Sequence, residues 1–159
     1  MINPIRETII LSLLPVSELR GAIPFAVYKG ISIYQAFIIA IIANLFVIPF
    51  VFFFLDHLHK YFMQNNYYRV VFNKYIEKKR CVLERYIGSK WEFFALVSFV
   101  GIPLPITGAY TGTLLAWFFE IPRRKAYIAL SLGILISGII VSLAVFFGIR
   151  TLDIFLKYI

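Results

Sequence analysis

The sequence has few of the residues on which catalytic and metal sites are usually built. It contains one cysteine, two histidines and eight acidic residues among 159 positions. A single cysteine excludes an intramolecular disulfide, and Cys81, His57 and His59 do not have the spacing of a zinc site. No nucleophile with a base and no cofactor motif is present, so we expect neither an enzyme nor a bound cofactor or metal. The N-terminus also lacks the basic start and small-residue cleavage site of a signal peptide, and we expect it to be retained.

Charge is scarce as well, because hydrophobic residues make up 61% of the chain and charged residues only 15%. The mean hydropathy is +0.85, and soluble domains contain roughly 45–50% apolar residues. The uncharged apolar runs 36–55, 93–119 and 126–149 each reach the roughly 18 residues needed to cross a bilayer. We therefore expect one small, all-α, multi-pass membrane domain.

The chain resembles itself when it is shifted by 90 residues. Without a gap, 15–17 (PVS) aligns with 105–107 (PIT), and 36–38 (AFI) aligns with 126–128 (AYI). Each half also has the same order of parts: a short apolar stretch, a Pro/Gly motif, a small turn and a long apolar helix. Such internal symmetry is typical of transporter folds. It predicts a first repeat at 1–55 and a second at 91–159.

Between the repeats lies a basic linker, 56–90, which the positive-inside rule places in the cytoplasm. Its alternating aromatic and basic residues predict an amphipathic helix on the anionic leaflet rather than a nucleic-acid arm. The next basic cluster is Arg123, Arg124 and Lys125, where we also expect anionic lipid headgroups to bind.

The two basic regions bear on whether 93–119 crosses the membrane. A full crossing would leave one of them outside, whereas a re-entrant hairpin, broken by its prolines and glycines, keeps both inside. Each flanking piece is about ten residues, or about 15 Å, which is half of the hydrocarbon core. Four complete crossings remain the simpler alternative. In the hairpin model the first motif enters from the opposite side, and the fold is an inverted repeat of two re-entrant hairpins, each followed by a long transmembrane helix.

The first motif, "LPVSELRGAIP" at 14–24, places Glu18 and Arg20 within this apolar chain. Residues two apart point away from each other on a regular helix, so we expect a turning, non-helical tip here. Charges at that depth cost roughly 2.5–3.5 kcal/mol each and need partners or a wet cavity. One interpretation is a structural ion pair that joins the hairpins. The other is a transport site, in which Arg20 binds an anionic group and Glu18 binds a proton or cation.

The second motif, "PLPITGAYTG" at 103–112, has hydroxyl groups and no charge. Together with Ser17, its side chains Thr107, Tyr110 and Thr111 are predicted to line the substrate or ion site. N–H groups at the starts of the half-helices would add donors for an anion. The residues predicted to break the helices at the two tips are Pro15, Gly21, Pro24, Pro103, Pro105, Gly108 and Gly112. Gly108 and Gly112 also fit GxxxG helix packing. Asn44 is expected to form an interhelical hydrogen bond on a small-residue face.

"SELRGAIP" together with "PLPITGAYTG" resembles the putative small multi-drug export protein family of prokaryotic membrane proteins. That architecture is distantly similar to DedA-type proteins, whose opposed re-entrant hairpins are associated with moving lipids or lipid-linked carriers. The resemblance implies a location in the prokaryotic inner membrane. This chain has Ile106 and Tyr110 where the family pattern has Gly and Trp, and its second motif lacks the arginine that DedA-type proteins carry.

These features favour a small secondary transporter for an anionic or amphipathic substrate, with Glu18 as the candidate group for proton coupling. We expect a homodimer, because one copy offers little protein to enclose two hairpins. Two alternatives remain open at the level of sequence: a lipid flippase or scramblase of the DedA-like type, and a membrane scaffold that transports nothing.

Overall fold

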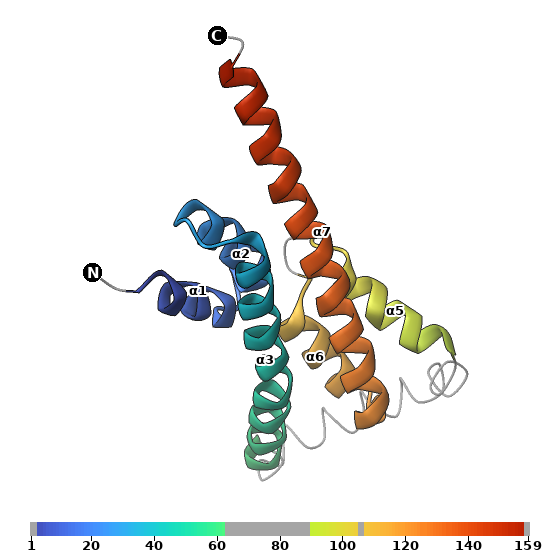
Figure 1. Cartoon of the computed structure of the whole chain (residues 1–159). Coiled ribbons are helices and arrows are strands. Elements are labelled where there is room, and N and C mark those ends of the chain that lie inside the picture. Colours follow the sequence, from blue (N-terminus) through green and yellow to red (C-terminus); the bar gives the residue numbers. More distant parts are fainter. Residues whose placement is uncertain (1–2, 63–89, 105–106, 158–159) are drawn as a thin grey trace.

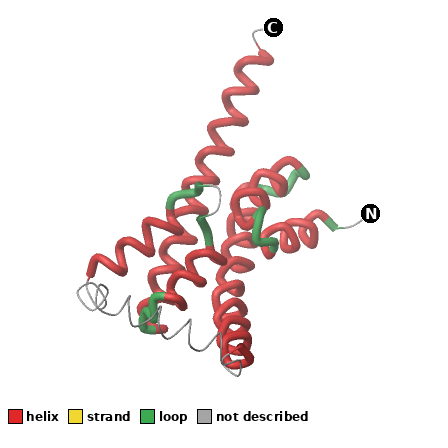
Figure 2. The backbone as a smooth tube through the Cα atoms, turned by 180° about the vertical axis from the view of Figure 1, so that it is seen from behind, coloured by secondary structure: helices red, strands yellow, loops and turns green. Residues whose placement is uncertain are grey.

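The computed structural model describes residues 3–62, 90–104 and 107–157, and this part of the chain is helical throughout, as predicted. In chain order its six helices are α1 (Pro4–Leu13), α2 (Glu18–Tyr28), α3 (Ile33–Phe62), α5 (Lys90–Gly101), α6 (Ala109–Phe118) and α7 (Arg123–Lys157) (Figure 1). Short turns connect the helices within each half (Figure 2).

Two of the helices are long and apolar enough to cross a membrane, over Ile33–Tyr61 of α3 and Arg123–Gly148 of α7. They run in opposite directions in Figure 1. Their outer faces carry large apolar side chains that are more than half exposed, among them Phe46, Phe50 and Phe53 on α3 and Ile128 and Phe147 on α7. Exposing so continuous an apolar surface to water would be unfavourable, whereas the hydrocarbon chains of lipids can cover it.

The other four helices are only 10–12 residues long. The apolar run 93–119 is therefore two helices rather than one, and the break at 102–108 falls in the Pro/Gly motif, as predicted. Pro103 and Gly108 lie in this break, while Pro105 lies outside the described residues. The break between α1 and α2 contains Pro15 and spans 14–17.

The prediction of a long non-helical tip was wrong for Gly21, Pro24 and Gly112, which lie inside helices. Pro24 removes one hydrogen bond from α2. The helix persists because its inner face, at Leu19, Ala22, Ile23 and Ala26, is at most 2% exposed and packs against the other helices. Glu18 and Arg20 thus belong to the first turn of a helix, not to an irregular loop.

The α2–α3 and α6–α7 turns have the same backbone pattern, 90 residues apart. Ile31 N–H donates to the Ala26 carbonyl, and Ile121 N–H donates to the Ala116 carbonyl, each at 3.0 Å. The preceding residues, Gly30 (φ 84°) and Glu120 (φ 54°), both lie in the left-handed region. The two turns therefore close onto their long helices in the same way.

Close packing of α5, α6 and α7 depends on glycines, which have no side chain at the helix contacts. Val100 of α5 fills the space above Gly112 of α6 and Gly133 of α7, where an added Cβ would lie 2.4 Å and 2.7 Å from its side chain. The packing expected for Gly112 from GxxxG is thus seen, but its close partner is Val100 of α5.

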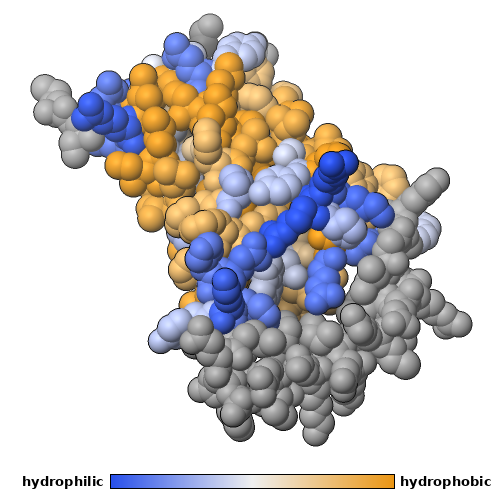
Figure 3. Space-filling view, turned by 90° about the horizontal axis from the view of Figure 1, so that it is seen from below, coloured by the Kyte–Doolittle hydropathy of each residue, from blue (hydrophilic) through white to orange (hydrophobic). Residues whose placement is uncertain are grey.

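At its C-terminal end α3 continues through Asp56 to Phe62, beyond the predicted start of the linker. The amphipathic helix predicted for the linker falls mostly on 63–89, outside the described residues. Seen from this end, hydrophilic residues gather beside a hydrophobic flank (Figure 3).

Candidate functional site

The first turn of α2 meets the first turn of α6 through Glu18. This residue is 6% exposed and has a left-handed φ of 46°. One carboxylate oxygen accepts from Ala109 N–H at 3.3 Å, and the other accepts from Tyr110 N–H at 3.4 Å. These N–H groups have no partner within their own helix, and the positive end of the helix dipole favours an anion there. The α6 donors predicted to hold a substrate anion therefore hold Glu18.

Gly108 makes this contact possible. A Cβ on Gly108 would lie 1.9 Å from one oxygen of the Glu18 carboxylate and 2.5 Å from its carboxyl carbon. Every other residue type would displace the carboxylate. The requirement for glycine comes from this close approach and not from backbone conformation, since Gly108 is extended, with φ 168°.

Arg20 also reaches from α2 to the second motif, but to a different group. Its guanidinium donates to the Thr107 hydroxyl at 3.3 Å. Thr107 is fixed in turn, because its hydroxyl lies 2.9 Å from the Ile102 carbonyl and accepts from Leu104 N–H at 3.2 Å. The two ion pairs among the described residues, Lys29–Glu7 and Arg123–Asp56, do not include Glu18 or Arg20. The predicted pair thus acts as two separate contacts between the motifs.

Tyr110 extends the site towards α1. Its hydroxyl donates to the Leu13 carbonyl at the end of α1, while its N–H holds Glu18. The Thr111 hydroxyl donates to the Gly108 carbonyl at 3.4 Å. The Ser17 hydroxyl lies beside Gly21, where an added Cβ would be 2.2 Å from it. The structure therefore brings Glu18, Arg20, Thr107 and Tyr110 together and leaves Ser17 and Thr111 at the edge.

Asn44 forms the predicted interhelical hydrogen bond, from its side-chain amide to the Ser12 carbonyl at 3.3 Å. It is fully buried, and its side-chain oxygen has no hydrogen-bond partner among the described residues. Since Ser12 precedes Leu13, Asn44 fixes the end of α1 that Tyr110 contacts.

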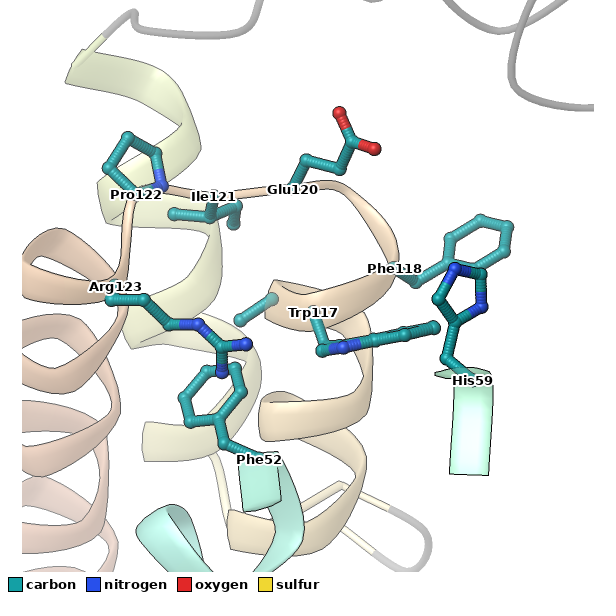
Figure 4. A pocket seen from close by; sticks show the side chains of 9 residues that line it. Phe52, His59, Trp117, Phe118, Glu120, Ile121, Pro122 and Arg123 are labelled. Atoms are coloured by element: carbon teal, nitrogen blue, oxygen red, sulfur yellow. The ribbon is translucent and has the colours of Figure 1, made fainter. Parts of the chain in front are cut away.

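A second cluster, which the sequence did not indicate, joins the ends of α3, α6 and α7. Asp56 accepts from Arg123 at 2.6 Å and from the Trp117 indole N–H at 2.9 Å. The Arg123 guanidinium lies 4.0 Å from the centre of the Phe52 ring, beside a cavity of about 380 Å³ (Figure 4). His59 packs edge-on against Trp117 in the same view, with ring centres 5.2 Å apart. Local sequence could not have suggested this cluster, because Asp56 is 61 residues from Trp117 and 67 residues from Arg123.

Among known proteins, the chain matches the model of one family, described as "putative small multi-drug export protein", over residues 18–140. No curated protein and no solved structure matches it. The family match begins at Glu18 and includes every residue of the contact between α2 and α6. Both motifs, the two long apolar helices and the match over most of its length place this chain in the putative small multi-drug export protein family.

Proposed function

We propose that this protein is a small secondary transporter of the cytoplasmic membrane, built as an inverted repeat whose two short-helix pairs meet at Glu18. Three observations support the repeat. The order of two short helices and one long helix occurs twice, the turns before the long helices match at an offset of 90, and α3 and α7 are antiparallel. The same offset equates Glu18 with Gly108, and these two residues touch. In an inverted repeat, positions that are equivalent in the two halves contact each other only beside the pseudo-two-fold axis, and this contact between Glu18 and Gly108 is consistent with such an axis.

The two ion pairs support re-entrant hairpins over four complete crossings. Asp56 near the end of α3 binds Arg123 at the start of α7, so both ends lie at one membrane face. Glu7 at the start of α1 lies 3.9 Å from Lys29 at the end of α2. The start of α1 and the end of α2 are therefore close together, as in a hairpin that enters and leaves at the same membrane face. Four crossings would put the partners of each pair on opposite sides, about 30 Å apart.

The buried Glu18 carboxylate is the observation that carries the transport proposal. An ionisable group within a membrane domain is costly, and here both of its oxygens rely on N–H groups of the other repeat. Protonation would remove the charge that holds α2 on the start of α6. Proton binding would thereby loosen the contact between repeats and free the α6 donors for another anion. This exchange provides a coupling step between a proton and a substrate.

An amphipathic substrate with an anionic group fits the surroundings of Glu18. Arg20 is partly exposed and offers a cation, and Thr107, which binds it, is partly exposed as well. The adjoining surface of α6 is apolar from Leu114 onward. We further propose a homodimer, because Ile5, Ile9 and Ile10 leave the outer face of α1 open to a second copy.

Transport is tested in liposomes that contain the purified protein, a trapped pH dye and fluorescent lysophosphatidylglycerol, a single-chain anionic amphiphile. We expect the amphiphile to cross only with a pH gradient, together with protons. Glu18→Gln should abolish this movement, whereas Glu7→Gln, which removes a carboxylate from the helix pair surface, should leave it intact.

Other results would contradict the proposal in distinct ways. Movement without a gradient that is lost in Arg20→Ala would indicate a scramblase. No movement of amphiphile or protons, with all variants folded, would indicate a scaffold.

A further inference from the structure

The cavity beside Arg123 lies at the end of α6, whereas Glu18 binds the start of that helix. Its volume of about 380 Å³ falls within the roughly 300–1,000 Å³ of small-molecule sites. Its lining is rich in rings and contains two charged side chains: Phe52, His59, Trp117, Phe118, Glu120 and Arg123. In Figure 4 the rings of His59, Trp117 and Phe118 gather on one side, and Arg123 lies with Phe52 on the other.

Glu120 gives this cavity an unbalanced negative charge. The guanidinium of Arg123 lies 2.6 Å and 2.8 Å from the two carboxylate oxygens of Asp56, so that pair is neutral. Neither of the two ion pairs among the described residues includes Glu120, which is an exposed residue on the turn after α6. The lining therefore favours a cation over an anion.

The backbone at Glu120 also indicates that its side chain has a role. Its φ of 54° lies in the left-handed region, and the matching turn after α2 has Gly30 there, with φ 84°. Glycine is the usual residue where a helix ends in this conformation, because other side chains are unfavourable at positive φ. A carboxylate at such a position, on the wall of a cavity, is the kind of strained residue that marks a binding site.

We propose that the cavity binds an organic ammonium group through the rings of Trp117 and Phe118 and the carboxylate of Glu120. Aromatic rings attract cations, tryptophan most strongly, and aromatic cages are a common way to bind quaternary ammonium groups. Arg123 shows the same chemistry on the opposite wall, where its guanidinium lies 4.0 Å from the centre of the Phe52 ring. The cavity is separate from the Glu18 contact, so this binding goes beyond the proposed function and does not depend on it.

The test uses the fluorescence of Trp117 in the full chain in phosphatidylglycerol nanodiscs. Trp91→Phe leaves Trp117 as the only tryptophan. The probes are choline and dimethylbutanol, in which carbon replaces the ammonium nitrogen without changing the shape. We expect a saturable response to choline and none to dimethylbutanol.

Both a free organic cation and the headgroup of a zwitterionic lipid carry an ammonium group, and a second lipid composition separates these sources. If phosphatidylethanolamine added to the nanodiscs competes with choline, the ligand is a lipid headgroup. If the choline response is unchanged, the ligand is a free cation.

Two variants of Glu120 separate binding from folding. Glu120→Gly relieves the left-handed backbone and should leave the protein at least as stable, yet it should weaken choline binding at least fivefold. Glu120→Gln keeps the size of the side chain and should weaken binding to a similar extent. Glu7→Gln removes a carboxylate on α1, outside the cavity lining, and should change binding less than twofold.

Equal responses to choline and dimethylbutanol would overturn the inference, because they would mean that the cavity does not recognise charge. Choline binding that survives in both Glu120 variants would also overturn it, and so would the lack of any saturable response in the Trp91→Phe protein.

Discussion

Replacing Gly108 by alanine should break the contact between α2 and α6 without changing any polar group. The new methyl group would lie 1.9 Å from a Glu18 oxygen, far inside van der Waals contact, so the carboxylate must leave the start of α6. No backbone strain contributes, because φ at Gly108 is extended. The substitution therefore changes the position of the Glu18 carboxylate but leaves the carboxylate itself in the protein.

The expected loss of stability follows from the two hydrogen bonds. Bonds to a charged acceptor are worth about 1.5–3 kcal/mol each. At 3.3 and 3.4 Å, the bonds from Ala109 and Tyr110 are long, so we take about 1.5 kcal/mol for each. Gly108→Ala should thus lower the free energy of unfolding by about 3 kcal/mol. Gly148→Ala is the matched control, since a Cβ there meets nothing within 4 Å and alanine favours a helix.

The assay is equilibrium unfolding in mixed micelles, followed by circular dichroism, on a double-mutant cycle of Gly108→Ala and Glu18→Ala. If the methyl group acts by displacing the carboxylate, the second substitution should add little to the first, with a coupling of about 2 kcal/mol. Additive losses would refute the reasoning, because they would mean that Gly108 and Glu18 stabilise the fold independently.

Three other substitutions test the packing and the second cluster. Gly133→Ala should cost about 1–3 kcal/mol by pressing on Val100, and Val100→Ala should restore most of it; failure of this rescue in the same unfolding assay would contradict the close packing of α5. Asp56→Ala should cost less than about 1 kcal/mol, because both partners are half exposed, yet it should shift the fluorescence of Trp117 by removing the acceptor of its indole N–H; an unchanged spectrum would argue against the indole bond. Asn44→Leu should cost about 1–3 kcal/mol by leaving the Ser12 carbonyl unpaired, and a neutral effect would show that this bond does not fix α1.

Much of the helical fold could be predicted from hydropathy and from the Pro/Gly motifs. The run 93–119 is long enough to cross a membrane, but Pro103 marks the break, because proline cannot continue a helix that needs its N–H. Local rules failed at Pro24 and Gly112. There, tertiary burial of α2 and close packing against Val100 stabilise helix where propensity opposes it.

The candidate site was predictable as a set of residues but not as a set of contacts. The cost of charge among apolar residues singled out Glu18 and Arg20. That Glu18 binds the start of α6 while Arg20 binds Thr107 depends on how two segments about 90 residues apart meet. The role of Gly108 could not be predicted from its local sequence either, since its close neighbour is the side chain of Glu18, 90 residues earlier in the chain.

The central claim is that the two short-helix pairs enter from opposite membrane faces and meet at Glu18. It is tested most directly by labelling single cysteines with a membrane-impermeant maleimide in a Cys81→Ser background. Ser32→Cys marks the exposed α2–α3 turn and Arg124→Cys the exposed start of α7. We predict that Ser32→Cys is labelled from the periplasmic side in right-side-out vesicles and Arg124→Cys from the cytoplasmic side in inverted vesicles. Labelling of both from the periplasmic side would mean that 93–119 crosses the membrane completely, and it would contradict the account.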